Sequence, residues 1–541
     1  MTSESGKTIL IFVIIAAASL TIKAPFAANR PRLCPDTIAY LDIAHHISIG
    51  QGFISTLKLN SLDSSAIKHS ALTDWPPLYP LFAASITGLG GDDRALQIAS
   101  AIFISIAAGL VFLIGAKLFT RRTGIAAGIL AAMAPNLFRA GTVAMSDALS
   151  LMLALAVITC VLYAENHPAC WSAVGVMTGL AFLTRFPNAL LFIILMIFLA
   201  AHPARRRYLV PVATGLAVTI APYLLWKWVI TGSPFSSAQW SHYTTLSISH
   251  TMWNYDTMPA DHLFAVHHPW LICRTVGHNL VSYIFDLLIG FRGLFLLSIG
   301  LLYLLIRKNR TTLAPQHKLI LMIATVNFTF YLLTWSIPPV RGSRFMLLSY
   351  CILLPFCIDG IRKLMPKRSI TSRRIAAVGF ACVAGVYIWG CVTASVYTDG
   401  EIRPIGKRTA TEIACMLPPG ANIASNNPWA AGYSTGIPTA LLPHNLDRQS
   451  LARFIAKYHI GAVVIFGDRP HSQTLSSLRV YQKTAPFCIF ALSHPRDRSA
   501  RRDYGQNAYE GMWNMMPQIV QKLPTTHSAR ITPRKNGSAR L

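Results

Sequence analysis

The sequence has little charge, and especially little negative charge. Only 13% of its 541 residues are Asp, Glu, Lys or Arg, and 21 acidic residues stand against 48 basic ones. Soluble domains carry about 25% charged residues. Here 53% of the residues are hydrophobic, and the mean hydropathy is +0.45. These values exclude an ordinary soluble domain and predict an integral membrane protein with membrane lipids around it.

Motifs for soluble cofactors and for zinc are also missing. The sequence contains no P-loop and no glycine pattern of a dinucleotide-binding fold, so we expect no site for a soluble nucleotide-sugar. The ten cysteines form no CxxC pair and show no Cys/His zinc spacing. The net charge of +27 is spread over basic residues between apolar segments, as in the cytoplasmic loops of membrane proteins. No nucleic-acid partner is therefore expected.

Long apolar runs, by contrast, recur along the first 400 residues. A spanning helix needs about 20 mostly apolar residues. About eleven transmembrane helices are predicted, near residues 8–24, 95–117, 122–138, 146–164, 171–184, 188–203, 208–230, 284–306, 318–337, 345–361 and 375–397. The first run follows Lys7 and precedes the small-residue sequence APFAA, so it is either a span or a signal peptide.

Lys and Arg residues predict the orientation of these spans. One set of short loops carries sixteen basic residues, and the opposite set carries four. Because cytoplasmic loops are rich in Lys and Arg, the N-terminus is predicted to be cytoplasmic and the chain after about residue 398 to lie outside. The transmembrane domain is then 1–397, with outer loops 25–94 and 231–283. The lack of a retention signal and of a dominant N-x-S/T pattern favours a bacterial inner membrane.

Residues 398–493 have a different pattern. The stretches ANIAS (421–425), GAVVIFG (461–467) and FCIFALS (487–493) are typical of buried strands, and helices are predicted near 408–417 and 448–458. We expect a small extracytoplasmic α/β domain here. Residues 494–541 form a basic tail with little apolar periodicity, which is predicted to be partly disordered.

Two carboxylates near the outer ends of apolar segments are candidates for chemistry. Asp36 opens PDTIAYLDIAHHISIGQGF, which is predicted to form an amphipathic helix along the membrane surface. Asp36 can cap that helix or accept a proton from a hydroxyl or amine. Asp147, in MSDALSLMLALA, can likewise cap a helix or act as a second carboxylate that orients an acceptor.

Three arginines map to the same predicted side. Arg185, in LTRFPNALL, either snorkels to the interface or binds a phosphate through paired donors. Arg341 and Arg344 precede a helix on the side where arginines are rare, and their charges oppose the helix dipole. An anionic partner would offset that cost, and a lipid phosphate or the bilayer head groups fit this role.

Other polar residues of the first outer loop are weaker candidates. Tyr40, Lys68, His69 and Asp74 are candidate substrate contacts, although a solvated loop is the alternative for the last three. A divalent metal stays open as a cofactor, because outer histidines are present, but adjacent pairs do not face one side of a helix. These histidines are His45, His46, His267 and His268. No metal ligand is assigned.

In their order, these motifs resemble those of the GT-C membrane glycosyltransferases, in the branch of the protein-O-mannosyltransferases and the lipid A aminoarabinose transferases. The resemblance is carried by PDTIAYLDIAHHISIGQGF, DWPPLYPLFAA, MSDALSLMLAL, LTRFPNALL, TGSPF and RGSRFMLLSYCILL. It implies a GT-C type bundle, a polyprenyl-phosphate sugar as donor and transfer on the outer side. DWPP departs from the lysine-plus-proline form of the family's second motif, which leaves a donor contact by Lys68 open.

The resemblance also implies roles for four residues. Asp36 corresponds to the family's proposed general base, and Asp147 to an acidic residue that opens a later outer-facing helix. Arg185 and Arg344 match arginines expected near the lipid phosphate. The sequence thus predicts an inverting hexosyl- or pentosyltransferase that acts on an unidentified protein, lipid or glycan acceptor. The alternatives are a transporter or flippase of a lipid-linked envelope intermediate, and a scaffold protein for envelope assembly.

Overall fold

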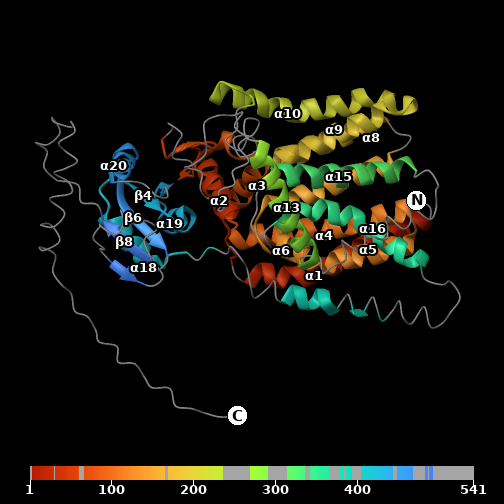
Figure 1. Ribbon diagram of the computed structural model, residues 1–541, viewed down its shortest axis with the longest axis horizontal. Helices are drawn as coiled ribbons and strands as arrows, with labels where there is room; N and C mark the ends of the chain where they lie inside the picture. The colour runs from red at the N-terminus through yellow and green to blue at the C-terminus, as the bar shows by residue number, and fades with distance from the viewer. Residues whose placement is uncertain are drawn as a thin grey trace, which may run out of the picture.

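A helical bundle and a small sheet domain form the two ends of the molecule. In the computed structural model, the described residues are 3–29, 31–59, 66–164, 168–235, 269–289, 314–334, 342–364, 378, 381–382, 385–392, 402, 404–442, 448–466, 482–484 and 487–491. Helices α2 (Pro35–Ser48) and α3 (Leu78–Gly88) lie between the two ends (Figure 1). Five described helices are long and apolar enough to cross a membrane. The predicted fold class, a polytopic helical membrane protein with a small α/β domain, is confirmed.

The described helices of the bundle follow the predicted apolar runs. They are α1 (Ser3–Asn29), α4 (Asp93–Leu118), α5 (Arg121–Met133), α6 (Pro135–Thr142), α7 (Ser146–Tyr163), α8 (Pro168–Thr184), α9 (Ala189–Ala200), α10 (Leu209–Thr231), α13 (Pro269–Ile289), α15 (Pro315–Thr334) and α16 (Leu347–Leu364). Helix α13 begins inside the predicted outer loop 231–283, earlier than the span expected at 284–306. Residues 236–268 of that loop lie outside the described part of the chain.

The span predicted at 122–138 is divided into α5 and α6. Pro135 has no N–H with which to continue the backbone hydrogen bonds of α5, so the helix ends just before it. The fully buried Lys23 of α1 donates a hydrogen bond of 2.6 Å to the carbonyl of Ala132 at this break. A cation at a helix C-terminus stabilises its last carbonyls. This contact explains why a lysine is tolerated inside an apolar bundle.

Basic residues gather at the bundle end that lies away from the sheet domain. Arg121 contacts Glu4 at 3.4 Å, and Arg362 donates a hydrogen bond of 3.2 Å to the hydroxyl of Thr120. At this end the buried Asp359 also pairs with Lys363 at 2.9 Å. The opposite end carries α2 and α3. These basic residues therefore share one end of the bundle, and the assignment of that end to the cytoplasm stays a prediction.

The sheet domain contains a six-stranded sheet with the order β2-β5-β4-β6-β8-β7. Its later strands are β4 (Asn422–Ser425), β5 (Thr439–Leu441), β6 (Ile460–Phe466), β7 (Gln482–Thr484) and β8 (Phe487–Ala491). Three of these, β4, β6 and β8, coincide with the strands expected from the sequence. The helices α18 (Lys407–Met416) and α20 (Arg448–Lys457) coincide with the expected helices, whereas α19 (Pro428–Thr435) was not expected.

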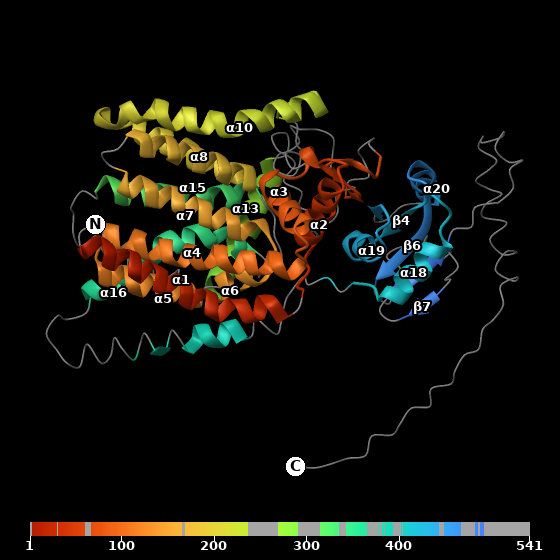
Figure 2. The same cartoon turned by 180° about the vertical axis from the view of Figure 1, so that it is seen from behind.

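The edge strand β2 (Leu57–Lys58) comes from the first loop of the chain, not from its C-terminal part. It runs parallel to β5, with Leu57 opposite Thr439. Helix α19 lies on the side of the domain that faces α2 (Figure 2), and its Tyr433 hydroxyl donates a hydrogen bond of 2.5 Å to Asp93 of α4. The sheet domain and the bundle are therefore joined by a shared strand as well as by side-chain contacts.

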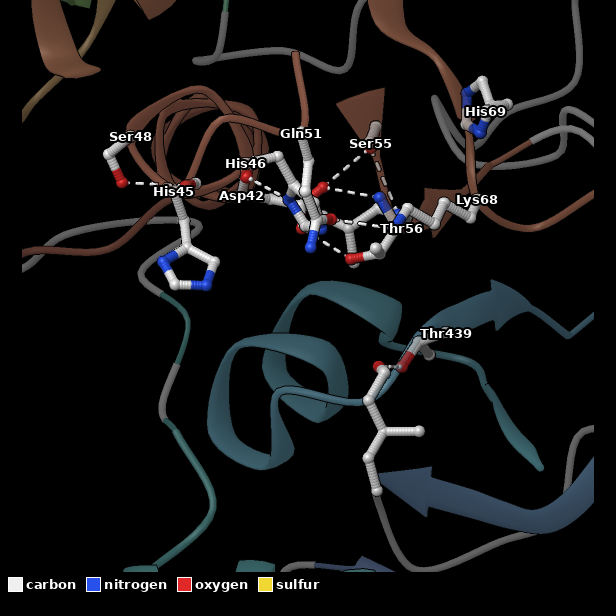
Figure 3. A network of polar contacts seen from close by, with 12 residues as sticks. Asp42, His45, His46, Ser48, Gln51, Ser55, Thr56, Lys68, His69 and Thr439 are labelled. Atoms are coloured by element: carbon white, nitrogen blue, oxygen red, sulfur yellow. Dashed lines mark hydrogen bonds and ion pairs between the residues drawn. The ribbon is translucent and has the colours of Figure 1, made fainter. Parts of the chain in front are cut away.

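A single carboxylate anchors this shared strand to α2. Asp42 accepts hydrogen bonds from the Ser55 hydroxyl at 2.8 Å and from the backbone N–H and hydroxyl of Thr56 at 2.8 and 2.5 Å (Figure 3). The carbonyl of Thr56 then accepts from the backbone N–H of Thr439 in β5 at 2.9 Å. A continuous path of hydrogen bonds thus leads from α2 into the sheet.

Candidate active site

The carboxylate of Asp36 does not cap its helix. The N-cap of α2 is Cys34, whose sulfur accepts a hydrogen bond from the backbone N–H of Thr37. Asp36 lies in the first turn, and its Oδ2 accepts a hydrogen bond of 2.7 Å from Nη1 of Arg344 in the short helix η5 (Gly342–Met346). Charged partners make such bonds strong. Arg344 thus pairs with a carboxylate of the chain itself, and its binding to a lipid phosphate stays a prediction.

Asp147 also opens a helix without capping it. The N-cap of α7 is Met145, and the adjacent Ser146 hydroxyl shares a hydrogen bond of 2.8 Å with the hydroxyl of Tyr40. The side chain of Asp147 is only 3% exposed. Its Oδ1 accepts a hydrogen bond from Nη1 of Arg185, and its Oδ2 lies 3.9 Å from Nη1 of Arg344. Arg185, one of whose predicted roles was snorkelling, is thus held by a buried carboxylate.

Four charged side chains therefore form one row of alternating sign: Asp36, Arg344, Asp147 and Arg185. They come from α2, η5, α7 and the junction between α8 and α9. Phe345 packs between the two arginines, with its ring centre 4.9 Å from the Arg344 guanidinium and 5.4 Å from that of Arg185. Both contacts are in the range of cation–π attraction. The row has no net formal charge, which makes its burial less costly than that of an unpaired ion.

Tyr40 supports this row. Its ring makes edge contacts with Trp75 and Tyr79, at centroid distances of 5.0 and 4.8 Å. Burial, together with the nearby negative charge of Asp36, raises the pKa of the Tyr40 hydroxyl. The hydroxyl therefore stays protonated at neutral pH and positions the start of α7. Tyr40 therefore lies next to Asp147. A contact between Tyr40 and the substrate stays a prediction.

The other first-loop candidates form a separate group. Lys68 is exposed and donates a hydrogen bond of 2.7 Å to Gln51 (Figure 3). His69 contacts the Ile67 carbonyl through Nδ1 and the Asp74 carboxylate through Nε2, both at 2.8 Å. A carbonyl and an ionised carboxylate only accept, so the two contacts favour the form of the ring that carries protons on both nitrogens. Burial lowers the pKa of His69, whereas its hydrogen bonds and the charge of the Asp74 carboxylate raise it. The raising effects are together larger, so the pKa lies above its ordinary value.

A metal site is not seen in the part of the chain that the structure describes. There, no group of three or more His, Cys, Asp or Glu side chains is arranged to hold an ion. His46 donates from Nδ1 to the carbonyl of Asp42 at 2.8 Å, and His45 is exposed (Figure 3). His267, His268 and Arg341 lie outside the described residues.

A pocket adjoins the charged row. It lies between α7, α15 and α16 and beside the junction of α8 and α9. Its lining consists of Asp147, Ser150, Leu151, Ala154, Arg185, Asn188, Asn327, Tyr331, Arg344, Phe345, Leu347 and Leu348. Sequence reasoning did not identify the polar members Ser150, Asn188 and Asn327. The available signal was their position within or next to apolar runs, where polar side chains are uncommon.

The fold of the bundle agrees with the resemblance to GT-C membrane glycosyltransferases expected from the sequence, and comparisons with known proteins support that resemblance. The family model described as dolichyl-phosphate-mannose-protein mannosyltransferase matches residues 74–229. That segment runs from Asp74 to the end of α10 and includes Asp147 and Arg185, but it excludes Asp36 and Arg344. No curated protein sequence matches the chain.

Solved structures share the fold at low sequence identity. ArnT from Cupriavidus metallidurans bound to undecaprenyl phosphate is 14% identical, with a TM-score of 0.56 over 90% of this chain and 99% of that one. The Archaeoglobus fulgidus oligosaccharyltransferase tethered to an acceptor peptide is 13% identical, with a TM-score of 0.57 over 85% of this chain and 69% of that one. The oligosaccharyltransferase AglB from the same organism, in complex with an inhibitory peptide and a dolichol-phosphate, is 12% identical. Its TM-score is 0.52 over 86% of this chain and 70% of that one.

Proposed function

We propose that this protein transfers a sugar from a polyprenyl-phosphate donor to an acceptor at the extracytoplasmic face of a membrane. One observation carries the proposal: two carboxylates and two guanidiniums from four separate segments converge beside a pocket in a membrane-spanning bundle. The similar structures that hold undecaprenyl phosphate and dolichol-phosphate support a lipid-linked donor. The basic opposite end of the bundle supports the proposed orientation, with that end in the cytoplasm.

Arg344 and Arg185 are the proposed phosphate ligands. A guanidinium has five N–H donors, and the polar contacts of both arginines with the described residues use only Nη1. Donors of each arginine are therefore left for a phosphate oxygen. Preorganised donors of this kind stabilise charge that develops on a leaving group, by about 2.7–4 kcal/mol for each one removed in known cases.

Asp36 is the proposed general base. Its oxygen Oδ2 is bonded to Arg344, which a donor phosphate also attracts, so phosphate binding weakens the hold of Arg344 on Asp36. The acceptor oxygen or nitrogen attacks the anomeric carbon as the bond from that carbon to the phosphate oxygen breaks. The polyprenyl phosphate leaves with the electron pair, and the acceptor proton passes to Asp36. A single displacement of this kind inverts the anomeric carbon.

Reconstitution into proteoliposomes tests the proposal. Radiolabelled polyprenyl-phosphate hexoses and pentoses serve as donors, and a bacterial envelope fraction serves as the source of acceptors. We expect transfer by the unchanged protein and none by D36N. The variant E412Q, which changes a surface carboxylate of the sheet domain, is the matched control and keeps activity. Movement of label across the membrane without transfer would favour the flippase alternative instead.

A further inference from the structure

Apart from Arg185 and Arg344, the polar lining of the pocket has no role in the mechanism above. Asp147 is the deepest charged group there, with a residue exposure of 4%. Its Oδ2 accepts no hydrogen bond from any described residue, although Arg344 lies 3.9 Å away. A buried carboxylate oxygen without a donor is unfavourable. The pocket therefore offers a strong acceptor to a ligand that carries O–H or N–H groups.

Two amides of the lining are held with a defined orientation. Asn188 donates from Nδ2 to the Ser150 hydroxyl and to the Ala181 carbonyl, both at 2.8 Å. Asn327 donates from Nδ2 to the Phe345 carbonyl at 3.3 Å and to the Ser349 hydroxyl at 3.0 Å. A carbonyl can only accept, so each amide nitrogen must face it. The oxygens of both amides are thereby left as acceptors on a preformed framework.

Ser150 supplies a donor to the same pocket. Its oxygen accepts the hydrogen bond from Asn188, so its own hydroxyl hydrogen is available to a ligand. Together the pocket presents the acceptor oxygens of Asp147, Asn188 and Asn327 and the donor of Ser150. A ligand with several hydroxyl groups complements this set, because each hydroxyl can donate and accept.

The charge and the walls of the pocket favour an uncharged ring. The two carboxylates and two arginines of the row balance one another, and the other polar groups of the lining are neutral. Tyr331 and Phe345, whose ring centres are 4.9 Å apart, form an aromatic wall.

We infer that this pocket binds the uncharged sugar of the donor, with Ser150, Asn188 and Asn327 as residues that recognise its hydroxyl groups. This inference rests on the proposed function. It assigns the phosphate and the sugar to two adjoining places: the arginines bind the phosphate, and the neutral polar groups select the sugar.

Binding measurements on the purified protein test the assignment without a known acceptor. The probes are a polyprenyl phosphate without sugar and a panel of the same lipid carrying different uncharged hexoses and pentoses. We expect at least one glycosylated lipid to bind more tightly than the bare lipid. The variants S150A and N188A should reduce that preference by about tenfold each, because each loses a hydrogen bond, while binding of the bare lipid stays unchanged.

Two matched controls lie in buried positions away from the pocket. S105A removes a hydroxyl of α4 that bonds only to the Ala101 carbonyl of its own helix. N279A removes an amide that donates to the Leu332 carbonyl at 2.9 Å. Neither residue lines the pocket, so both variants should keep the preference for the glycosylated lipid. Loss of preference in the controls as well would show a general effect of packing and overturn the assignment.

The remaining outcomes separate the two proposals. Glycosylated lipids that bind no more tightly than bare polyprenyl phosphate would overturn the sugar pocket and leave the proposed donor class intact. If S150A loses affinity equally for the bare and the glycosylated lipids, the pocket holds the lipid chain. That result would also overturn the sugar pocket. If N188A fails to fold, S150A alone decides between these results. Failure of every polyprenyl phosphate to bind would overturn the proposed function itself.

Discussion

Helix α2 carries two carboxylates, Asp36 and Asp42, whose surroundings differ sharply. Asp42 is satisfied by three neutral donors of Ser55 and Thr56, two of them on the same residue. Asp36 is bonded to one long side chain, Arg344, which also lies near Asp147. A carboxylate held by backbone and short side chains fixes structure, whereas one that shares its cation with a second carboxylate can exchange its partner. One end of α2 is thus suited to chemistry and the other to anchoring.

The largest difference between the two carboxylates should appear in catalysis. D36N removes the proposed proton acceptor while keeping the size of the side chain, and we expect sugar transfer to fall by about 10²–10⁴-fold. D42N should leave most of the transfer rate, since Asp42 does not touch the pocket. Initial rates in proteoliposomes check this. Equal losses in the two variants would contradict the division of roles along α2.

Arg344 should show the next largest effect. R344K keeps a positive charge near Asp36 but loses the planar set of guanidinium donors. R344Q loses the charge as well as these donors. We expect transfer to fall by about 10²–10³-fold in R344Q and by less in R344K. Rates and affinities for bare polyprenyl phosphate measured side by side check this order. Undiminished lipid affinity in R344Q would remove Arg344 from the phosphate site.

Asp42 should dominate stability instead. In D42N the amide places an N–H group opposite donors, so at least one of the bonds to Ser55 and Thr56 is lost. We expect the free energy of unfolding to fall by about 1–3 kcal/mol. Thermal unfolding in detergent gives the loss, and hydrogen exchange should report faster exchange at the N–H groups of Thr56 and Thr439. Unchanged exchange at Thr439 would show that the strand pairing does not depend on Asp42.

A smaller, pH-dependent contribution should come from His69. Its pKa is raised in the folded state, since the bond to Asp74 outweighs the opposing effect of burial. The stability supplied by this pair is therefore fully present below about pH 6.5, the unfolded value. It is lost as the pH rises through the higher folded pKa. Unfolding midpoints at a series of pH values check this, and in D74N that part of the pH dependence should disappear.

Much of the bundle and part of the sheet could be predicted from the sequence, because they depend on local pattern. Apolar runs located the spans, and the buried strand β6 has an almost continuous hydrophobic sequence. The edge strand β2 was not predicted, since two residues carry no recognisable periodicity and its partner β5 lies far along the chain. The break at Pro135 had a clear local signal that the prediction of one span at 122–138 did not use.

The candidate site was predictable in its charged members and not in their pairing. Asp36, Asp147, Arg185 and Arg344 attract notice because charges near apolar runs are uncommon. Which arginine faces which carboxylate is decided by the packing of α7, η5 and α2, and no local pattern records that. Asn188 and Asn327 were missed because a neutral amide near an apolar run is compatible with a purely structural hydrogen bond and does not by itself indicate a site.

The contact between Arg344 and Asp36 joins residues that are 308 positions apart. During synthesis the carboxylate is therefore made long before its cation, and the row of charges is complete only once the chain has been inserted up to η5. A nascent chain that ends before η5 therefore lacks one of the two arginines that we propose as phosphate ligands.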